Sequence, residues 1–575
     1  MTRSEAVPAR GHDLERLLGD PYAPGNPLGF DAILAADERA EAFADGEAAL
    51  DEYGLNAEFV PHAYGGRFAR VDDLVEIMRS VYRRDPALGL GYGTSSFISS
   101  VNVWAAADEE QCRTVAAQLL ANRKVACAYH ELAHGNDVAR SDFAALPDGE
   151  DLVLNGRKEV VANIQRADAL VLFARTGTGP GSRSHSQVYV DKASLPPDAL
   201  RYLQRFPSLG MRGVQLGGVE FTDCRLPAGN ILGRPGQGLE TALKSFQVTR
   251  TAVPAMMTAV LDTGLRTTLR HVRTRHLYGR TAADLPWIRS ALSGAFTDLL
   301  MCEAFASAGA RALHLLPQQT SVYASAVKFG ISQRLLDAMH QLSVVLGAHS
   351  YLRQGPNAIF QKLHRDLKPV GFGHAARAVC QVSVLPQLPL LAKRSWAAPA
   401  AADPALFRRD AVLPALRMDR LAVSGRGGDA LVASLPTALE ALPDGTDRRV
   451  HDLVAHFTAE LADLTDVCAA LSPAGLSFMA DPAAYDLVVR YVTVLTAAAC
   501  VQTWLHNSDG PDAFLADPAW LIAVLHRLRA KPGAVADEAP EDVQVRLMTE
   551  LLDRHDHDRS FGIANRTYTT GKGRT

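Results

Sequence analysis

The spacing of hydrophobic and polar positions changes twice along the chain. Between about residues 28 and 122 the apolar spacing is helical, with residues 74, 77, 78 and 81 on one face. From about residue 124 to 238, short alternating runs are separated by Gly/Ser-rich breaks, a pattern typical of a small β-barrel or sandwich. From Leu239 the spacing becomes helical again and stays so for most of the remaining chain.

These changes predict an α+β fold that is mainly α. The expected units are an N-terminal helical domain (1–123), a β-domain (124–238), a four-helix bundle (239–395) and a further helical domain (405–560). An Ala- and Pro-rich linker, residues 396–404, opens the last unit. Residues 1–26 are expected to be an irregular lead-in, and residues 561–575 a disordered tail.

Composition narrows the class of protein. The 575 residues are 47% hydrophobic and 21% charged, which is ordinary for a soluble globular protein. A net charge of -4 gives no electrostatic reason to expect nucleic acid or an anionic membrane. The seven cysteines are scattered without CxxC spacing, which favours free thiols in a reducing compartment over metal or disulfide frameworks. With no apolar leader and no long uncharged apolar stretch, we expect a cytoplasmic protein without a membrane span.

Residues 209–238 carry the most specific motif. Leu209-Gly210-Met211-Arg212-Gly213 is followed by Val219-Glu220-Phe221, by residues 226–233 (LPAGNILG), and by Gly236 and Gly238. These segments resemble the (L)GxRG…F(D/N)xxxVPxxNxLG…GxG junction of the acyl-CoA dehydrogenase family. The resemblance continues to about residue 395 and implies the family's fold, with an extra C-terminal helical domain as in its longer members.

The resemblance implies FAD as cofactor, bound between the β-domain and the bundle. In the family a carboxylate removes the α-proton of an acyl thioester, and the β-hydrogen leaves as hydride to flavin N5. Residues 128–137 (AYHELAHGND) resemble the first flavin loop, A-x-T-E-P-x-x-G-S-D. This implies flavin contacts from Tyr129, His130, Gly135 and Asn136, with Asn136 also facing the substrate. His130 and Asn136 replace Thr and Ser but can still donate hydrogen bonds.

A second flavin segment follows in the β-domain. Residues 156–163 (GRKEVVAN) resemble G-x-K-x-W-I-T/S-N, and Lys158 and Asn163 match. The tryptophan is replaced by Val160 and the hydroxyl near N5 by Ala162, which is still expected beside the flavin. Each loss is worth on the order of 1 kcal/mol, which need not abolish binding of so large a ligand.

The bundle carries a third set of implied contacts. Arg250 and Arg275 have the 25-residue spacing of two family arginines on one long helix, and Arg250 is assigned to the substrate. Residues 275–280 (RHLYGR) resemble R-x-x-F-G-x, so Arg275 and Tyr278 are expected to contact the FAD of a neighbouring subunit in a homodimer or homotetramer. The planar fork of an arginine suits pyrophosphate oxygens. Gly347 lies in a segment similar to the G-G-x-G-Y turn, with Ala348 in place of a glycine.

The catalytic carboxylate of the family is replaced. Counting nine residues from Arg365 in residues 365–374 (RDLKPVGFGH) leads to His374, and the family's alternative base position is Thr249. A histidine has a reference pKa near ~6.5, so its neutral imidazole could take a proton at cellular pH. The residues are equally compatible with a packing role for His374 in a site that has lost its base.

Three functions remain open from these residues. The first is FAD-dependent α,β-dehydrogenation of an acyl thioester, on coenzyme A or a carrier protein, with His374 as base and an external electron acceptor. The second is a flavin-dependent monooxygenase-type reaction. The third is a catalytically inactive subunit or acyl-binding scaffold that partners an active paralogue. We take the first as the working hypothesis, and expect no metal.

Overall fold

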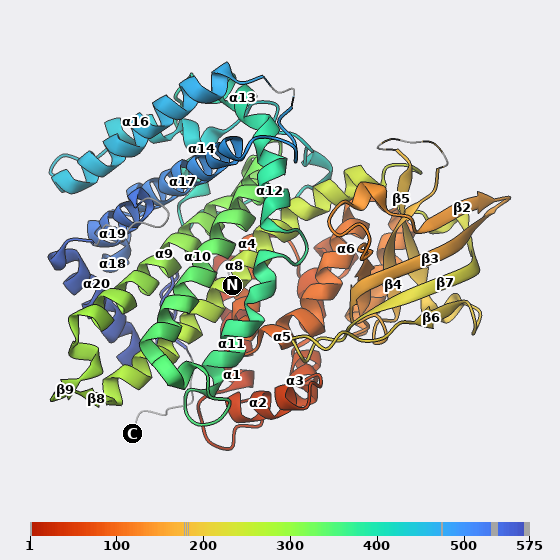
Figure 1. Cartoon of the computed structure of the whole chain (residues 1–575), viewed down its shortest axis with the longest axis horizontal. Helices are drawn as coiled ribbons and strands as arrows, with labels where there is room; N and C mark the ends of the chain where they lie inside the picture. The colour runs from red at the N-terminus through yellow and green to blue at the C-terminus, as the bar shows by residue number, and fades with distance from the viewer. Residues whose placement is uncertain are drawn as a thin grey trace.

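The N-terminal region is helical, as its apolar spacing predicts (Figure 1). The computed structural model describes residues 3–177, 179, 181, 183–472, 475–530 and 539–568, with side chains from residue 9 onward. The first helices are α1 (Arg3–Leu18), α2 (Phe30–Glu38), α3 (Ala44–Tyr53), α4 (Val71–Tyr82), α5 (Pro86–Leu88), α6 (Ser95–Ala106) and α7 (Glu109–Leu120). Leu74, Ile77, Met78 and Val81 are buried on one face of α4, which packs against the long helix α8 (Gly238–Thr274).

Helix α1 stands where the sequence predicts an irregular lead-in, and that prediction is wrong for residues 3–18. Glu15 anchors the helix, because its carboxylate accepts hydrogen bonds from Arg83 Nε at 2.8 Å and from Arg84 Nη2 at 2.7 Å. All three side chains are buried. Long-range ion pairing therefore outweighs the weak local helix propensity of a segment with proline and glycine.

Protonation of Glu15 at low pH should weaken its contacts with Arg83 and Arg84. Burial alone would raise the pKa of Glu15, but the guanidiniums of Arg83 and Arg84 outweigh it and lower the pKa from 4.5 to about 2. Because the folded-state pKa is the lower one, the carboxylate stabilises the fold above pH 4.5 and loses that contribution as the pH falls towards 2. Glu15→Gln is expected to lower the free energy of unfolding at pH 7 by about 3–5 kcal/mol. It should also flatten the loss of stability below pH 4.5, measured by calorimetry. The exposed Glu52→Gln is the control, and equal pH slopes in both variants would contradict this role.

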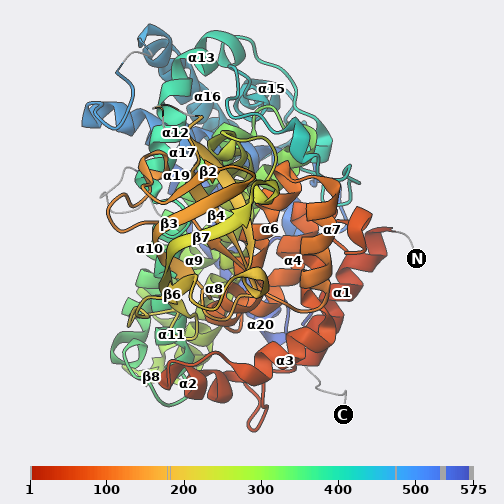
Figure 2. The same cartoon turned by 90° about the vertical axis from the view of Figure 1, so that its right-hand side faces the viewer.

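A seven-stranded sheet forms the β-domain (Figure 1). Its strands are β1 (Val125–Ala128), β2 (Ala144–Asp148), β3 (Asp151–Ala162), β4 (Ala169–Arg175), β5 (His185–Asp191), β6 (Leu200–Tyr202) and β7 (Leu216–Pro227). The order is β1-β4-β2-β3-β7-β6, and β5 pairs with β4. One apolar cluster fills the domain itself, and a second joins it to α6 and α7. Figure 2 looks from the side of this sheet and shows the N-terminal helices beside it.

Long helices occupy the centre of the molecule: α8, α9 (Pro286–Leu315) and α10 (Thr320–Leu346). A hairpin of β8 (His276–Leu277) and β9 (Arg280–Thr281) joins the first two. The fourth helix of the predicted bundle is divided into α11 (Ala358–Asp366), α12 (Arg377–Val384) and α13 (Leu388–Leu391). The break follows from the φ of 56° at His374, because right-handed helices require negative φ. The prediction of a mainly helical α+β fold is confirmed.

The C-terminal region is helical, and three of its helices pack against α9 (Figure 1). They are α14 (Ala430–Ala433), α15 (Leu435–Glu440), α16 (Arg448–Ala470), α17 (Pro482–Leu505), α18 (Ala513–Ala516), α19 (Pro518–Arg529) and α20 (Glu541–Asp556). Their buried apolar side chains join those of α4, α8, α9 and α10 in one continuous core. The predicted further helical domain is therefore built as an added layer on the bundle.

Helix α17 is long and apolar enough, by length and composition, to cross a membrane. It carries Asp486 and Arg490, and 61% of its most apolar window is buried inside the protein. A core helix passes the same test of length and composition, and α17 packs against α9, α16 and α19.

Residues 559–568 fold back onto α8 and α9, although the sequence predicts disorder from residue 561. The Phe561 amide donates to Asp262 Oδ2 at 2.8 Å, and the Ile563 amide donates to Glu303 Oε2 at 2.9 Å. The Tyr568 ring lies 3.8 Å from the guanidinium carbon of Arg83. The prediction is wrong for residues 561–568 because buried carboxylates far away in sequence hold them. Residues 569–575 lie outside the described residues.

Candidate active site

The glycine-rich junction joins the β-domain to the helices. The Met211 amide donates to Asp366 Oδ1 at 2.7 Å. A Cβ on Gly210 would lie 2.6 Å from the carbonyl oxygen of Arg365, so only glycine allows this approach. These contacts fix the start of the loop that leads to His374.

Lys158 ties the first predicted flavin loop to the second. Its Nζ donates to Glu131 Oε1 at 2.7 Å, to Ser141 Oγ at 2.6 Å and to the Tyr129 carbonyl at 3.2 Å. Burial would raise the pKa of Glu131, but the ammonium of Lys158 and hydrogen bonds to the carboxylate lower it to about 2. The two segments are therefore held by one buried ion pair.

The side chain of Tyr129 is buried and fully hydrogen-bonded. Its hydroxyl donates to Asn102 Oδ1 at 2.8 Å and accepts from Gln187 Nε2 at 2.6 Å, and the residue is 2% exposed. This side chain belongs to the core, so only the main chain of Tyr129 could contact a flavin.

The other predicted flavin contacts of the β-domain face outward. His130 pairs with Val160 in an isolated bridge, and its Nδ1 lies 3.0 Å from the Gly135 carbonyl oxygen. Gly135 has a φ of 55°, and a Cβ there would meet open space. Asn136 and Ala162 are partly exposed. This set of main-chain groups, the Asn136 amide and a small side chain fits a flat heteroaromatic ligand.

His374 contacts Thr249, so the two positions that the resemblance assigns to a base are neighbours. His374 Nε2 lies 2.5 Å from Thr249 Oγ1, and the imidazole packs edge-on against Phe246 with ring centroids 4.8 Å apart. The Thr249 hydroxyl can donate to the Ser245 carbonyl oxygen at 3.3 Å, which leaves its oxygen to accept from Nε2–H. In that tautomer the free lone pair of the imidazole lies on Nδ1.

The imidazole of His374 is held neutral. Burial lowers its pKa well below 6.5, and the positive charges of Arg250 and Lys328 lower it further. The Phe246 ring contacts both His374 and Tyr129 of the β-domain, with ring centroids 4.8 and 5.7 Å apart, so the first predicted flavin loop begins near the imidazole. A neutral imidazole with a free lone pair can accept a proton near neutral pH.

Lys328 is a site residue that the sequence reading missed. Its Nζ donates to the Gly373 carbonyl at 3.1 Å and so ties α10 to the His374 loop. It is the lone charged residue in residues 320–331 (TSVYASAVKFGI), and a lysine isolated in an apolar helix is the signal that could have found it.

Arg275, Tyr278 and Gly347 gather at another place. Arg275 ends α8, Tyr278 is 90% exposed in the β8–β9 turn, and Gly347 ends α10 with a φ of 57°. The rings of His271 and His349 lie 4.6 Å apart and join these two helix ends.

This second group is remote from the first. At 1.5 Å per residue, Arg275 lies about 39 Å from Thr249 along α8. An extended FAD molecule is shorter than this, so one flavin cannot contact both groups within a single chain.

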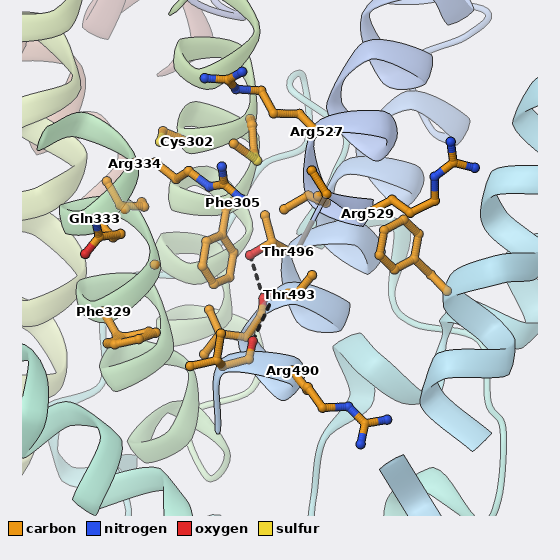
Figure 3. A pocket seen from close by; sticks show the side chains of 18 of the residues that line it. Cys302, Phe305, Phe329, Gln333, Arg334, Arg490, Thr493, Thr496, Arg527 and Arg529 are labelled. Atoms are coloured by element: carbon orange, nitrogen blue, oxygen red, sulfur yellow. Dashed lines mark hydrogen bonds between the residues drawn. The ribbon is translucent and has the colours of Figure 1, made fainter. Parts of the chain in front are cut away.

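A large cavity, of about 920 Å³, lies away from both groups (Figure 3). It opens between α9, α10, α16, α17 and α19, and Phe305 and Phe329 form part of its apolar wall. The Thr493 and Thr496 hydroxyls on its wall donate to main-chain carbonyls of their own helix at 2.9 and 2.7 Å. None of the predicted site residues lines this cavity, so its size is no reason to place the candidate active site there.

Comparisons with known proteins agree with the geometry. Two family models match: "Acyl-CoA dehydrogenase, middle domain" over residues 126–224, and "Acyl-CoA dehydrogenase, C-terminal domain" over residues 236–374. Isovaleryl-CoA dehydrogenase of Pongo abelii is 25% identical over 259 residues, 44% of this chain and 60% of that protein. The matched part of the chain thus spans 60% of the length of this relative.

Two solved structures share the fold. Butyryl-CoA dehydrogenase from Megasphaera elsdenii superposes with a TM-score of 0.59 at 17% identity, over 67% of this chain and 97% of that one. The prolyl acyl carrier protein oxidase AnaB gives 0.59 at 18% identity, over 66% and 98%. The β-domain and the long helices up to His374, residues 126–224 and 236–374, therefore match the acyl-CoA dehydrogenase family in sequence and in fold.

Proposed function

We propose that the protein binds FAD and catalyses α,β-dehydrogenation of an acyl thioester, with His374 as the base. The observation that carries this proposal is the contact of 2.5 Å between His374 Nε2 and Thr249 Oγ1, since it unites both candidate base positions around a neutral imidazole. The match to the family and the outward face of the loop at Gly135 support the cofactor.

Each residue of the site has a separate role in the proposed reaction. Bound FAD would supply the acceptor for the β-hydrogen. Thr249 holds the imidazole in the tautomer that leaves Nδ1 free, and His374 Nδ1 takes the α-proton. His130 and Asn136 would hold the flavin from the β-domain side. An external electron acceptor completes the cycle.

The visible absorbance spectrum of the purified protein tests the proposal. We expect a flavin spectrum that bleaches when an acyl thioester, on coenzyme A or on a carrier protein, is added without oxygen. A flavin that no thioester reduces, but that consumes oxygen with an external reductant, would favour the monooxygenase-type reaction. A protein that cannot bind added FAD would contradict both and leave the scaffold.

We further propose a homo-oligomer in which Arg275 and Tyr278 contact the flavin of a second copy. Arg275→Ala should lower the affinity for FAD by about 10-fold to 100-fold, because a hydrogen bond to a charged group is worth about 1.5–3 kcal/mol. Flavin content by absorbance is the measurement, and Arg280→Ala in the same hairpin is the matched control. Mixing Arg275→Ala with His374→Ala subunits should restore activity, since one hybrid site has both residues intact. Failure of the mixture, with mixed oligomers formed, would contradict the shared site.

A further inference from the structure

Two buried cations beside His374 lack an anionic partner. Arg250 is 7% exposed, its Nε is buried without a hydrogen-bond partner, and its guanidinium lies 4.9 Å from the ring centroid of Phe246. Lys328 is 2% exposed, and its ammonium donates to the Gly373 carbonyl. Within the part of the chain that the structure describes, neither has a carboxylate within ion-pair distance.

The other buried lysine and arginine side chains each have a carboxylate partner. Nine lysine and arginine residues are buried among the described residues, and seven of them have a carboxylate oxygen within 4.0 Å. These seven are Arg83, Arg84, Lys158, Arg266, Arg311, Lys362 and Arg554. The two exceptions, Arg250 and Lys328, lie at one place.

The arrangement is costly without a ligand. A buried charge without a partner is strongly unfavourable, and two like charges together add repulsion. Accordingly, burial lowers the pKa of Lys328 to about 8, with a further contribution from Arg250. The acidic group that acts on both cations is the buried Cys380 thiol, and burial raises its pKa, so it supplies no negative charge at neutral pH.

The pair adjoins the group that takes the proton. Arg250 follows Thr249 on α8, and Lys328 holds the carbonyl next to His374. The phosphate groups of coenzyme A or of a carrier protein lie at the far end of the pantetheine arm from the thioester. An anion next to the base therefore belongs to the acyl group.

Resting on the proposed function, we infer that Arg250 and Lys328 form a carboxylate-binding subsite. The substrate is then a thioester whose acyl chain carries its own carboxylate, that is, the monothioester of a dicarboxylic acid. Charge-assisted hydrogen bonds from the two cations would hold this carboxylate and orient the α-carbon toward His374.

The test compares matched pairs of thioesters on the flavin-loaded protein. Succinyl-, glutaryl- and adipyl-CoA are titrated against butyryl-, pentanoyl- and hexanoyl-CoA, with perturbation of the flavin absorbance as the measure of Kd. The best dicarboxylic thioester should bind about 10-fold to 100-fold more tightly than its uncharged match. The preference should persist with pantetheine thioesters, which lack the coenzyme A phosphates. Its loss there would assign the anion to the phosphates and overturn the proposal.

Variants of Lys328 locate the effect. Lys328→Met should shrink the preference to less than threefold, and Lys328→Arg should keep it. If Lys328→Met does not fold, the wild-type protein still provides a test through pH. The groups facing Lys328 are Arg250 on α8, Cys380 on α12 and His374 in the loop. Because the lysine must be protonated to bind the carboxylate, the preference should fall by up to tenfold per pH unit above about pH 8.

The outcomes separate this inference from the proposed function. Uncharged thioesters that bind as tightly as dicarboxylic ones, while still reducing the flavin, would overturn the subsite alone. A preference that survives in Lys328→Met would do the same. If no thioester of either kind perturbs or reduces the flavin, the dehydrogenase proposal itself fails, and the subsite fails with it.

Discussion

Replacing His374 by alanine is expected to slow flavin reduction by an acyl thioester by about 100-fold to 10,000-fold, the range that a positioned general base contributes. The imidazole is the group whose lone pair is free beside Thr249, and alanine leaves no proton acceptor there. Stopped-flow loss of flavin absorbance without oxygen measures the rate. His374→Glu restores the family's carboxylate and should recover much of it. Equal flavin content and melting temperature in the variants are the controls.

The pH dependence of the same rate is a second readout of His374. The base acts in its unprotonated form, so a lowered pKa moves the loss of activity to lower pH. Because burial, Arg250 and Lys328 hold the pKa of His374 well below 6.5, the rate should be flat from about pH 8 down to about pH 6. An unchanged rate in His374→Ala, or a wild-type transition centred above pH 6.5, would remove His374 from this role.

Lys158→Met is expected to lower the free energy of unfolding by about 3–5 kcal/mol, because it leaves the Glu131 carboxylate buried without its partner. Since Lys158 also holds the Tyr129 carbonyl and Ser141, the purified variant should lose its flavin. Chemical denaturation gives the first quantity, and the ratio of visible to ultraviolet absorbance gives the second.

Two further variants make the Lys158 result specific. The exposed Lys393→Met should change neither stability nor flavin content. The double variant Lys158→Met with Glu131→Gln removes both charges, so it should be more stable than Lys158→Met alone. If the two single changes simply add, the ion pair does not have the role described for it.

The order of elements could be predicted from the sequence because each pattern depends on near neighbours. The helical face of α4 and the alternation of Val219 and Phe221 in β7 are local signals, and both appear in the structure. His374 could be located because its distance from Arg365 is a short count within one loop. Its neighbour Thr249 lies 125 residues away, and only the fold brings the two together.

The features that the sequence did not predict depend on contacts between distant parts of the chain. Helix α1 is held by Arg83 and Arg84, 68 and 69 residues from Glu15. The sequence could not show that the Tyr129 hydroxyl is used in two hydrogen bonds, because its partners Asn102 and Gln187 lie 27 and 58 residues away. The importance of Lys328 likewise comes from what the fold places around it, which is a second cation, Arg250, and no carboxylate within ion-pair distance among the described residues.

The contact between Phe561 and Asp262 has a consequence for synthesis. The 299 residues that separate them take about 15–60 s to make at ribosomal rates of about 5–20 residues per second. Within that interval, from the completion of α9 at Leu315 until α17 begins at Pro482, α9 lacks the cover of α17, α19 and α20, whereas the strands of the β-domain emerge within one continuous stretch. A nascent chain should therefore recruit chaperones through its central helices, and a ribosome stalled after α10 should leave a folded β-domain beside an aggregation-prone bundle.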